Sequence, residues 1–349
     1  GMVTRNERNA IIQHGTMTMV RRELLQRIGW SEWCITEDAE LGLRILDEGY
    51  ATTYIARSYG RGLMPDTFLD FKKQRSRWAF GAMQILRRHF DALIHGRDTG
   101  LTSGQRYHFV AGWLPWLADG FNLLVNLAAL AWSLVMVLFP RHIEPPLMLF
   151  SVLPLSLFLF KLVKLLHLYR ARVGATFTQT IAAAIAGLGL SHTVGSAMLS
   201  GFVNKDRPFF RTPKRTTRHA WLQSLAAARE EAVLMCGLWI AAFAVSSIPQ
   251  MDGDQPGLVG SPDLTVWVAV LLVQSIPYAA AVLVSLVSSL QLSGDWIGEA
   301  RDPVFDATAA AAEPALDAVA TGTSTLPVGS LARNNGGALP ATAKLDSAK

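Results

Sequence analysis

An acidic triplet near the N-terminus is the first group of residues suited to acid–base chemistry. Thr36-Glu37-Asp38 opens a stretch of helical character that follows the apolar, aromatic segment 30–35. The free backbone amides and the helix dipole stabilise an ionised carboxylate in a first helical turn. Such a carboxylate can accept a proton from a hydroxyl group, so Asp38 is a candidate general base. Acidic residues in a first turn also stabilise helices without any further role, and the triplet alone leaves both interpretations open.

A second group lies at residues 74–78, within another predicted helix. Gln74, Arg77 and Trp78 are three and four residues apart, so they share one helix face, with Arg75 beside them. Guanidinium groups bind phosphate oxygens through two hydrogen bonds. An indole plane packs on the apolar face of a sugar ring. The alternative is a solvated arginine cluster with Trp78 packed in the core.

The third group is a basic segment at residues 207–215, between apolar stretches. It combines four cationic side chains with two prolines, Pro208 and Pro213, and two aromatic residues, Phe209 and Phe210. Juxtamembrane basic residues that touch anionic lipid are the ordinary explanation for such a cluster. The prolines and aromatic residues indicate a defined loop conformation, which a simple charge cluster does not require.

Two helices and two short strands are predicted to carry these groups in residues 1–100. The first helix covers 36–48 and is stopped by Gly49, and the second begins with the capping pattern of Thr67 to Asp70 and runs to residue 90. Strands are expected at 16–20 and 51–56. So few strands amount to half of an α/β domain at most.

The composition of the remainder indicates membrane segments. Of the 349 residues, 50% are hydrophobic and 17% are charged, which excludes a disordered or nucleic-acid-binding tail as the bulk of the chain. The two cysteines provide no disulfide framework. Four apolar stretches approach the ~20 residues needed to cross a bilayer. They are 121–139, 147–168, 232–248 and 264–290.

Charge distribution predicts the topology of these four spans. Residues 161–230 carry eleven Lys or Arg and two acids, whereas 249–263 carry three acids and no base. Basic loops face the cytoplasm, so residues 1–100 and the C-terminus are expected there too. Residues 176–202 are interpreted as an interfacial or partly buried helix, since a fifth span would separate the basic groups. Asn122, Asn126 and Trp132 either line a channel or join helices.

We therefore divide the chain into four regions. These are a cytoplasmic catalytic part at 1–100, an interfacial amphipathic helix at 101–118, a transmembrane region at 119–292 with a cytoplasmic loop at 205–218, and a disordered tail at 293–349. The interfacial helix is rich in aromatic residues. The tail is composed of residues that cannot bury a core.

Taken together, the three groups resemble the processive, membrane-embedded family 2 glycosyltransferases of the cellulose synthase type. That family carries a TED triplet, a Q-x-x-R-W helix and an F-x-V-T-x-K gating loop, in this order. The triplet at 36–38 and residues 74–78 match in full, and residues 209–214 match except that Arg211 replaces valine. Ahead of the triplet, the family's Cys-Gly-Ser element is His14-Gly15-Thr16 here. The resemblance covers about residues 10–290. It implies the C-terminal part of an α/β GT-A-type catalytic domain, followed by an α-helical transmembrane bundle of about four spans.

The resemblance also implies residue roles. Asp38 would be the general base of an inverting, processive transfer from a UDP-sugar, with UDP-glucose the best match, to a growing β-glycan that crosses the membrane. Trp78 would stack on the acceptor sugar. The other expected substrate-binding residues are Thr36, Glu37, Gln74, Arg75, Arg77, Phe209, Thr212 and Lys214.

Cofactor and partners follow from the same resemblance. Mg²⁺ or Mn²⁺ is expected, with its ligands in an N-terminal half that this sequence does not contain, and no metal ligand is predicted here. The D-x-D pattern at 252–254 falls in the predicted external loop. The expected partners are a UDP-sugar, the nascent glycan, membrane lipid and polysaccharide export proteins, without nucleic acid. The expected location is the bacterial inner membrane, multi-pass, with the catalytic part in the cytoplasm.

Two other functions remain open at this point. One is a nonprocessive membrane glycosyltransferase acting on a lipid acceptor, which product length would distinguish. The other is a non-catalytic membrane channel or scaffold whose arginines and basic loop bind lipid headgroups. Replacing Asp38 with Asn would abolish sugar transfer but leave lipid binding unchanged.

Overall fold

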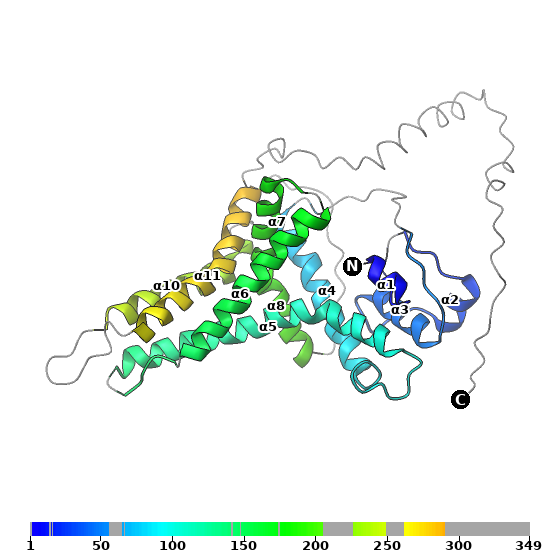
Figure 1. The fold of residues 1–349 in the computed structure, drawn as a ribbon, viewed down its shortest axis with the longest axis horizontal. Helices are drawn as coiled ribbons and strands as arrows, with labels where there is room; N and C mark the ends of the chain where they lie inside the picture. The colour runs from blue at the N-terminus through cyan, green and yellow to red at the C-terminus, as the bar shows by residue number, and fades with distance from the viewer. Residues whose placement is uncertain are drawn as a thin grey trace, which may run out of the picture. The chain divides into compact units, whose positions relative to one another are not determined.

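The computed structural model describes residues 2–13, 15, 17–55, 65, 67–140, 142–146, 148–173, 175–204, 226–248 and 262–289. The regular structure in these ranges is helical (Figure 1). The helices in chain order are α1 Met2–Glu7, α2 Arg22–Ile28, α3 Glu37–Asp47, α4 Phe68–Arg88, η1 Asp91–His95, α5 Ser103–Leu138, α6 Met148–Leu168, η2 Tyr169–Val173, α7 Phe177–Gly189, α8 Ser191–Val203, α10 Arg229–Ser246 and α11 Pro262–Ser289. The predicted tail at 293–349 lies outside the described residues.

The two helices predicted in the first hundred residues are confirmed as α3 and α4. Thr36 is the N-cap residue of α3, and Gly49 follows the helix with a φ of 80°, in the left-handed region that favours glycine. At the start of α4, the Thr67 hydroxyl oxygen accepts a hydrogen bond of 3.2 Å from the Asp70 amide. Local end signals therefore fix both helices.

The two predicted strands do not form in the residues that the structure describes, 17–20 and 51–55. Segment 51–55 has strand-type composition, but its amides bond to side chains instead of to a neighbouring strand. The amides of Thr52 and Tyr54 donate to the side-chain oxygens of Asn9 (2.7 Å) and Asn6 (2.6 Å). The strand prediction is therefore wrong for these residues, and the α/β class of the complete domain stays a prediction.

Helix α5 unites the predicted interfacial helix with the first predicted span. It begins at a capping box of Thr102 and Gln105 and continues through Pro115 to Leu138, so no break occurs at residue 118. The continuation is packed tightly against α8. A Cβ atom on Gly195 would stand 2.6 Å from the Asp119 carbonyl oxygen, so only glycine allows this approach. The interfacial position of the first turns stays a prediction.

Three stretches of the described residues are long and apolar enough to cross a membrane. They are Ser103–Leu138, Phe177–Val203 and Asp263–Ser288. The first and third overlap the predicted spans at 121–139 and 264–290. The second consists of α7 and α8 and was expected to be interfacial or partly buried. The other two predicted spans fold as α6 and α10. The count of four spans stays a prediction.

Two large apolar cores lie among the described residues, and a third, smaller one joins α2 to α3. The first combines Phe80 and Met83 of α4 with Phe109 of α5 and Met198 of α8. The second joins α5, α10 and α11, and α10 runs alongside α11 (Figure 1). Helix α4, which carries the Gln74–Trp78 motif, is thus packed directly on the apolar helices.

Asn126 lies where α5 contacts α11. It is fully buried, and its Nδ2 donates a hydrogen bond of 2.6 Å to the Tyr278 hydroxyl, which joins α5 to α11. For Asn126 the helix–helix interpretation is therefore the better one. Trp132 is exposed and its indole donates to the Glu144 carbonyl.

Candidate active site

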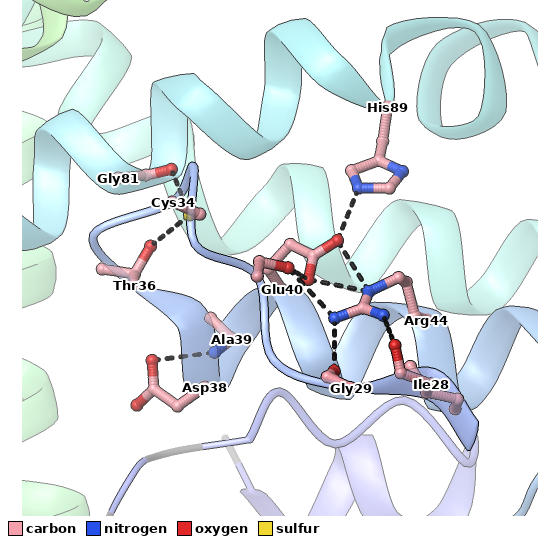
Figure 2. A network of polar contacts seen from close by, with 11 residues as sticks. Ile28, Gly29, Cys34, Thr36, Asp38, Ala39, Glu40, Arg44, Gly81 and His89 are labelled. Carbon is pink, nitrogen blue, oxygen red and sulfur yellow. Dashed lines mark hydrogen bonds and ion pairs between the residues drawn. The ribbon is translucent and has the colours of Figure 1, made fainter. Parts of the chain in front are cut away.

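The candidate general base stands at the start of α3. Asp38 is the second residue of the helix and is partly buried, and its Oδ1 accepts a hydrogen bond of 2.8 Å from the Ala39 amide (Figure 2). Gly15 approaches the carboxylate from the preceding segment, where a Cβ atom would lie 3.0 Å from Oδ2. The segment ahead of the triplet therefore reaches the candidate base.

The acidic triplet touches α4 through its first residue. A Cβ atom on Gly81 would stand 2.2 Å from Thr36 Oγ1, so glycine is required at this contact. Cys34 reinforces it, because its thiol lies 3.4 Å from the Thr36 hydroxyl and 4.0 Å from the Gly81 carbonyl (Figure 2). Burial raises the pKa of the Cys34 thiol to about 11, so the group stays protonated at neutral pH. Gly81 lies three residues after Trp78, which places the triplet beside the second motif.

Gln84 ties the same loop to α4 through two backbone hydrogen bonds. Its Oε1 accepts from the Ile35 amide and its Nε2 donates to the Trp33 carbonyl, each at 3.0 Å. The side chain is buried, so these bonds replace lost contacts with water. The backbone leading into the triplet is therefore held from both sides of Cys34.

Glu40 forms the centre of a polar network on the other face of α3 (Figure 2). Its two oxygens accept bonds of 2.9 and 2.8 Å from Arg44 Nε, and the carboxylate also bonds to Ser31 and, at 3.1 Å, to His89. Burial raises the pKa of Glu40, but the hydrogen bonds from His89, Ser31 and Arg44 outweigh it and hold the pKa below its usual value. Arg44 also donates to the carbonyls of Ile28 and Gly29. This network fixes the loop before α3.

In the second motif, the Arg75 side chain stacks on two aromatic rings. The Arg75 guanidinium lies 4.9 Å from the centre of the Phe71 ring and 4.5 Å from that of the Trp78 ring. Burial lowers the pKa of Arg75, and its Nε has no hydrogen-bond partner in the described part of the chain. Gln74, Arg77 and Trp78 are partly buried on the same helix. A buried donor without a partner marks Arg75 as a group that can still accept an anionic ligand.

Comparison with known proteins finds similarity in the region that carries the triplet and the Gln74–Trp78 motif. Residues 2–171 match the model of the family described as glycosyl transferase family group 2. The cellulose synthase 1 catalytic subunit (UDP-forming) of Komagataeibacter xylinus is 29% identical over 130 residues, 37% of this chain and 16% of that protein. The cellulose synthase catalytic subunit (UDP-forming) of Pseudomonas fluorescens is 34% identical over 125 residues, 36% of this chain and 16% of that protein. That of Komagataeibacter sucrofermentans is 35% identical over 98 residues, 28% of this chain and 12% of that protein.

Residues 2–171 are thus similar to family 2 glycosyltransferases, and the named relatives are cellulose synthases. The resemblance inferred from the motifs is therefore confirmed. The matched parts cover less than a fifth of the length of these three relatives, which leaves the activity of the whole protein as a proposal.

The described residues do not form a metal site. Within the ranges that the structure describes, no three His, Cys, Asp or Glu side chains are grouped to hold an ion. Glu40, the acid next to the triplet, is already engaged by Arg44, Ser31 and His89. The described residues therefore do not fit Mg²⁺ or Mn²⁺, and the metal cofactor stays a prediction.

The remaining predicted site residues lie outside the described part of the chain. Phe209, Thr212 and Lys214 belong to residues 205–225, which the structure does not describe. Conversely, sequence reasoning missed Gln84, Glu40 and Gly81. The spacing of Glu40 and Arg44, four residues apart on a helix, was a signal for an ion pair. The contacts of Gln84 and Gly81 carry no sequence signal, because their partners lie about fifty residues away.

Proposed function

We propose that the full protein transfers glucose from UDP-glucose to a growing β-glycan, processively and with inversion at the anomeric carbon, and passes the product across the membrane. Family membership supports sugar transfer. The relatives named as UDP-forming cellulose synthases favour UDP-glucose as donor and a β-glucan as product. The apolar helices that pack on α4 support delivery of the product into the membrane.

The contact between Thr36 and Gly81 carries this proposal. It places the N-terminus of α3, with Asp38, beside the part of α4 that follows Trp78. Gln84 holds the intervening backbone to the same helix. Packing and hydrogen bonds thus hold the segment that leads into Asp38 against the helix that carries Trp78, which supports their proposed roles as base and sugar-stacking indole.

The chemical step uses these groups as follows. Asp38 removes the proton from a hydroxyl group of the acceptor sugar, which stacks on Trp78. The resulting oxygen attacks the anomeric carbon of the donor from the face opposite the diphosphate. The bond between that carbon and the phosphate oxygen breaks, and UDP leaves with the electron pair. An α-linked donor thus gives a β-linked product.

Cationic and polar groups would stabilise the leaving diphosphate. Gln74, Arg75 and Arg77 lie on α4, and the buried Nε of Arg75 has no hydrogen-bond partner among the described residues. By the resemblance, Phe209, Thr212 and Lys214 would contact the nucleotide from the basic segment. Positive charge aimed at the developing negative charge lowers the barrier of such transfers.

The test is incorporation of labelled sugar by membranes that contain the full-length protein. A panel of UDP-sugars is supplied with Mg²⁺, and high-molecular-weight, glycosidase-sensitive product is measured. Asp38→Asn is expected to abolish incorporation. Glu23→Gln makes the matching acid-to-amide change in the first turn of α2, at an exposed site, and should leave incorporation unchanged.

Product length separates the proposal from transfer of a single sugar to lipid. Polymer that grows while the enzyme stays bound supports processive synthesis. A labelled lipid carrying one sugar would replace the proposal with nonprocessive transfer. Absence of incorporation from every UDP-sugar, with inserted and folded protein, would reject UDP-sugar transfer altogether.

A further inference from the structure

A buried carboxylate lies where three helices meet. Glu231, in the first turn of α10, is fully buried, and its Oε1 lies 2.5 Å from Lys72 Nζ of α4 and 3.1 Å from His192 Nδ1 of α8. Lys72 also donates a hydrogen bond of 2.7 Å to the Ala227 carbonyl, just ahead of α10. One carboxylate oxygen therefore joins α4, α8 and α10, while Oε2 has no partner in the described part of the chain.

Such a site is costly to build for stability alone. Removing a carboxylate and an ammonium from water carries a large desolvation penalty, and apolar side chains of similar size often serve stability equally well. An ion pair instead restricts the relative position of two helices, because its charged groups meet in only one register of the helices that carry them. The pair of Lys72 and Glu231 thus specifies how α4 sits against α10.

Helix α4 has a second polar anchor at its other end. Arg87 Nη1 donates to the carbonyls of Gly201 (2.9 Å) and Asn204 (3.1 Å) at the C-terminal end of α8. Between the anchors, Gly201 packs so closely on Met83 that an added Cβ would lie 2.6 Å from its Cβ. The Gln74–Trp78 motif therefore lies between two fixed points on one helix. Trp78 is six residues from Lys72, about 9 Å along the axis.

We propose that Lys72 and Glu231 are a positioning pair for glycosyl transfer. The pair sets the rotation of α4 about its axis and its position along that axis, relative to α8 and α10. It thereby places Trp78, and the acceptor sugar stacked on it, in line with Asp38. Neither residue touches the reacting atoms. This inference rests on the proposed function, because it concerns the geometry of that same acceptor site.

The activity test measures transfer and hydrolysis separately in the full-length protein. A misplaced acceptor lets water take the sugar instead, so the ratio of free sugar to polymer should rise in Lys72→Met and Glu231→Gln. We expect kcat for transfer to fall about tenfold or more, with the KM for the donor changed less than about twofold. Lys72→Arg should retain most activity. Lys72→Met/Glu231→Gln should be no worse than the poorer single variant, because one interaction is lost in each case.

The matched control is Arg27→Met, which removes a cation from the exposed pair that Arg27 forms with Glu48. It should leave kcat and the hydrolysis ratio unchanged. A simple loss of folded protein would lower transfer and hydrolysis together. An unchanged ratio in Lys72→Met and Glu231→Gln, or additive effects in the double variant, would overturn the positioning role.

A distance measurement tests the inference without turnover. Cys236 on α10 is exposed and Cys34 is buried, so Lys73→Cys on α4 adds the second site for a spin-label pair. The distance distribution between the labels should be narrow, and Glu231→Gln or Lys72→Met should broaden or shift it. Unchanged distributions in both variants would refute the pair, even if the wild-type protein turned over no UDP-sugar.

Discussion

Gly81 of α4 faces Thr36 at the N-terminus of α3 with no space for a side chain between them. This contact joins the acidic triplet to the helix that carries Trp78. It therefore connects the element that carries Asp38 to the helix that carries Trp78 by packing, in addition to the hydrogen bonds of Gln84, and its removal is the most direct test of their arrangement.

Gly81→Ala is expected to destabilise the protein and to lower sugar transfer about tenfold. The added Cβ would stand 2.2 Å from Thr36 Oγ1 and 2.6 Å from its Cγ2, so α3 must shift. Overpacking costs about 1–3 kcal/mol, which exceeds the gain of up to about 1 kcal/mol in helix propensity. Gly187→Ala is the control, because its Cβ would lie 3.8 Å from Leu165. Equal effects of both changes would contradict the prediction.

Gln84→Leu is expected to lower the unfolding temperature and kcat together. The change leaves the Ile35 amide and the Trp33 carbonyl without their bonds to Gln84, at about 1–3 kcal/mol for each unsatisfied group. Gln84→Glu keeps the acceptor for Ile35 and should lose less. Thermal unfolding in detergent and initial transfer rates provide the measurements. A leucine variant equal to the wild type would show that the loop is held by packing alone.

The network around Glu40 predicts a dependence of stability on acid. Because the folded pKa of Glu40 lies below its ordinary value of 4.5, the network stabilises the fold above that pH and is lost as pH falls through the folded value. The unfolding temperature should therefore drop below about pH 4.5. In Glu40→Gln this part of the drop should be absent, with a lower unfolding temperature already at pH 7. Parallel curves for the two proteins would contradict the prediction.

The two cysteines should differ sharply in reactivity. With its pKa raised to about 11 by burial, Cys34 carries almost no thiolate at neutral pH, whereas Cys236 is exposed. Because Cys236 lies in the predicted span 232–248, a small maleimide that enters detergent micelles is used. Labelling of the native protein should then stop at one label per chain, and denatured protein should take two. A peptide map identifies the labelled residue. Native labelling at Cys34 would mean that the loop between Trp33 and Thr36 opens readily.

Arg75→Met is expected to raise the KM for the UDP-sugar about tenfold, because it removes charge but keeps apolar contact with Phe71 and Trp78. Arg88→Met is the matched control on the same helix. Arg88 also lies over an aromatic ring, that of Trp33 at 5.7 Å, but is exposed. A change in KM of similar size in both variants would indicate a general effect of charge instead of donor binding.

Helices with strong end signals were predictable from sequence. Thr67, Asp70 and Gly49 act on their own neighbours in the chain, and α3 and α4 therefore begin and end near the predicted positions. The triplet and the Gln74–Trp78 motif were predictable for the same reason. The triplet was expected at the start of a helix, and Gln74, Arg77 and Trp78 share a helix face by their spacing alone; the roles of these residues stay proposals.

Features that depend on distant partners were not predictable. Glu231 follows the pattern of an ordinary acid in a first turn, and its burial results from Lys72, 159 residues away. The Thr-, Tyr- and Ile-rich segment at 51–55 favours a strand only where a neighbouring strand supplies hydrogen bonds. Here asparagine side chains supply them. Packing of α8 against Asp119 likewise depends on a glycine whose partner is remote in sequence.

The asparagine bonds to segment 51–55 have a consequence for solubility. An extended segment with free amides along one edge is a template for pairing with another chain. The amides of Thr52 and Tyr54 are already occupied by Asn9 and Asn6, and the Thr52 hydroxyl also bonds to Asn9. Two short side chains thus protect this aromatic, β-prone segment from intermolecular strand addition and aggregation.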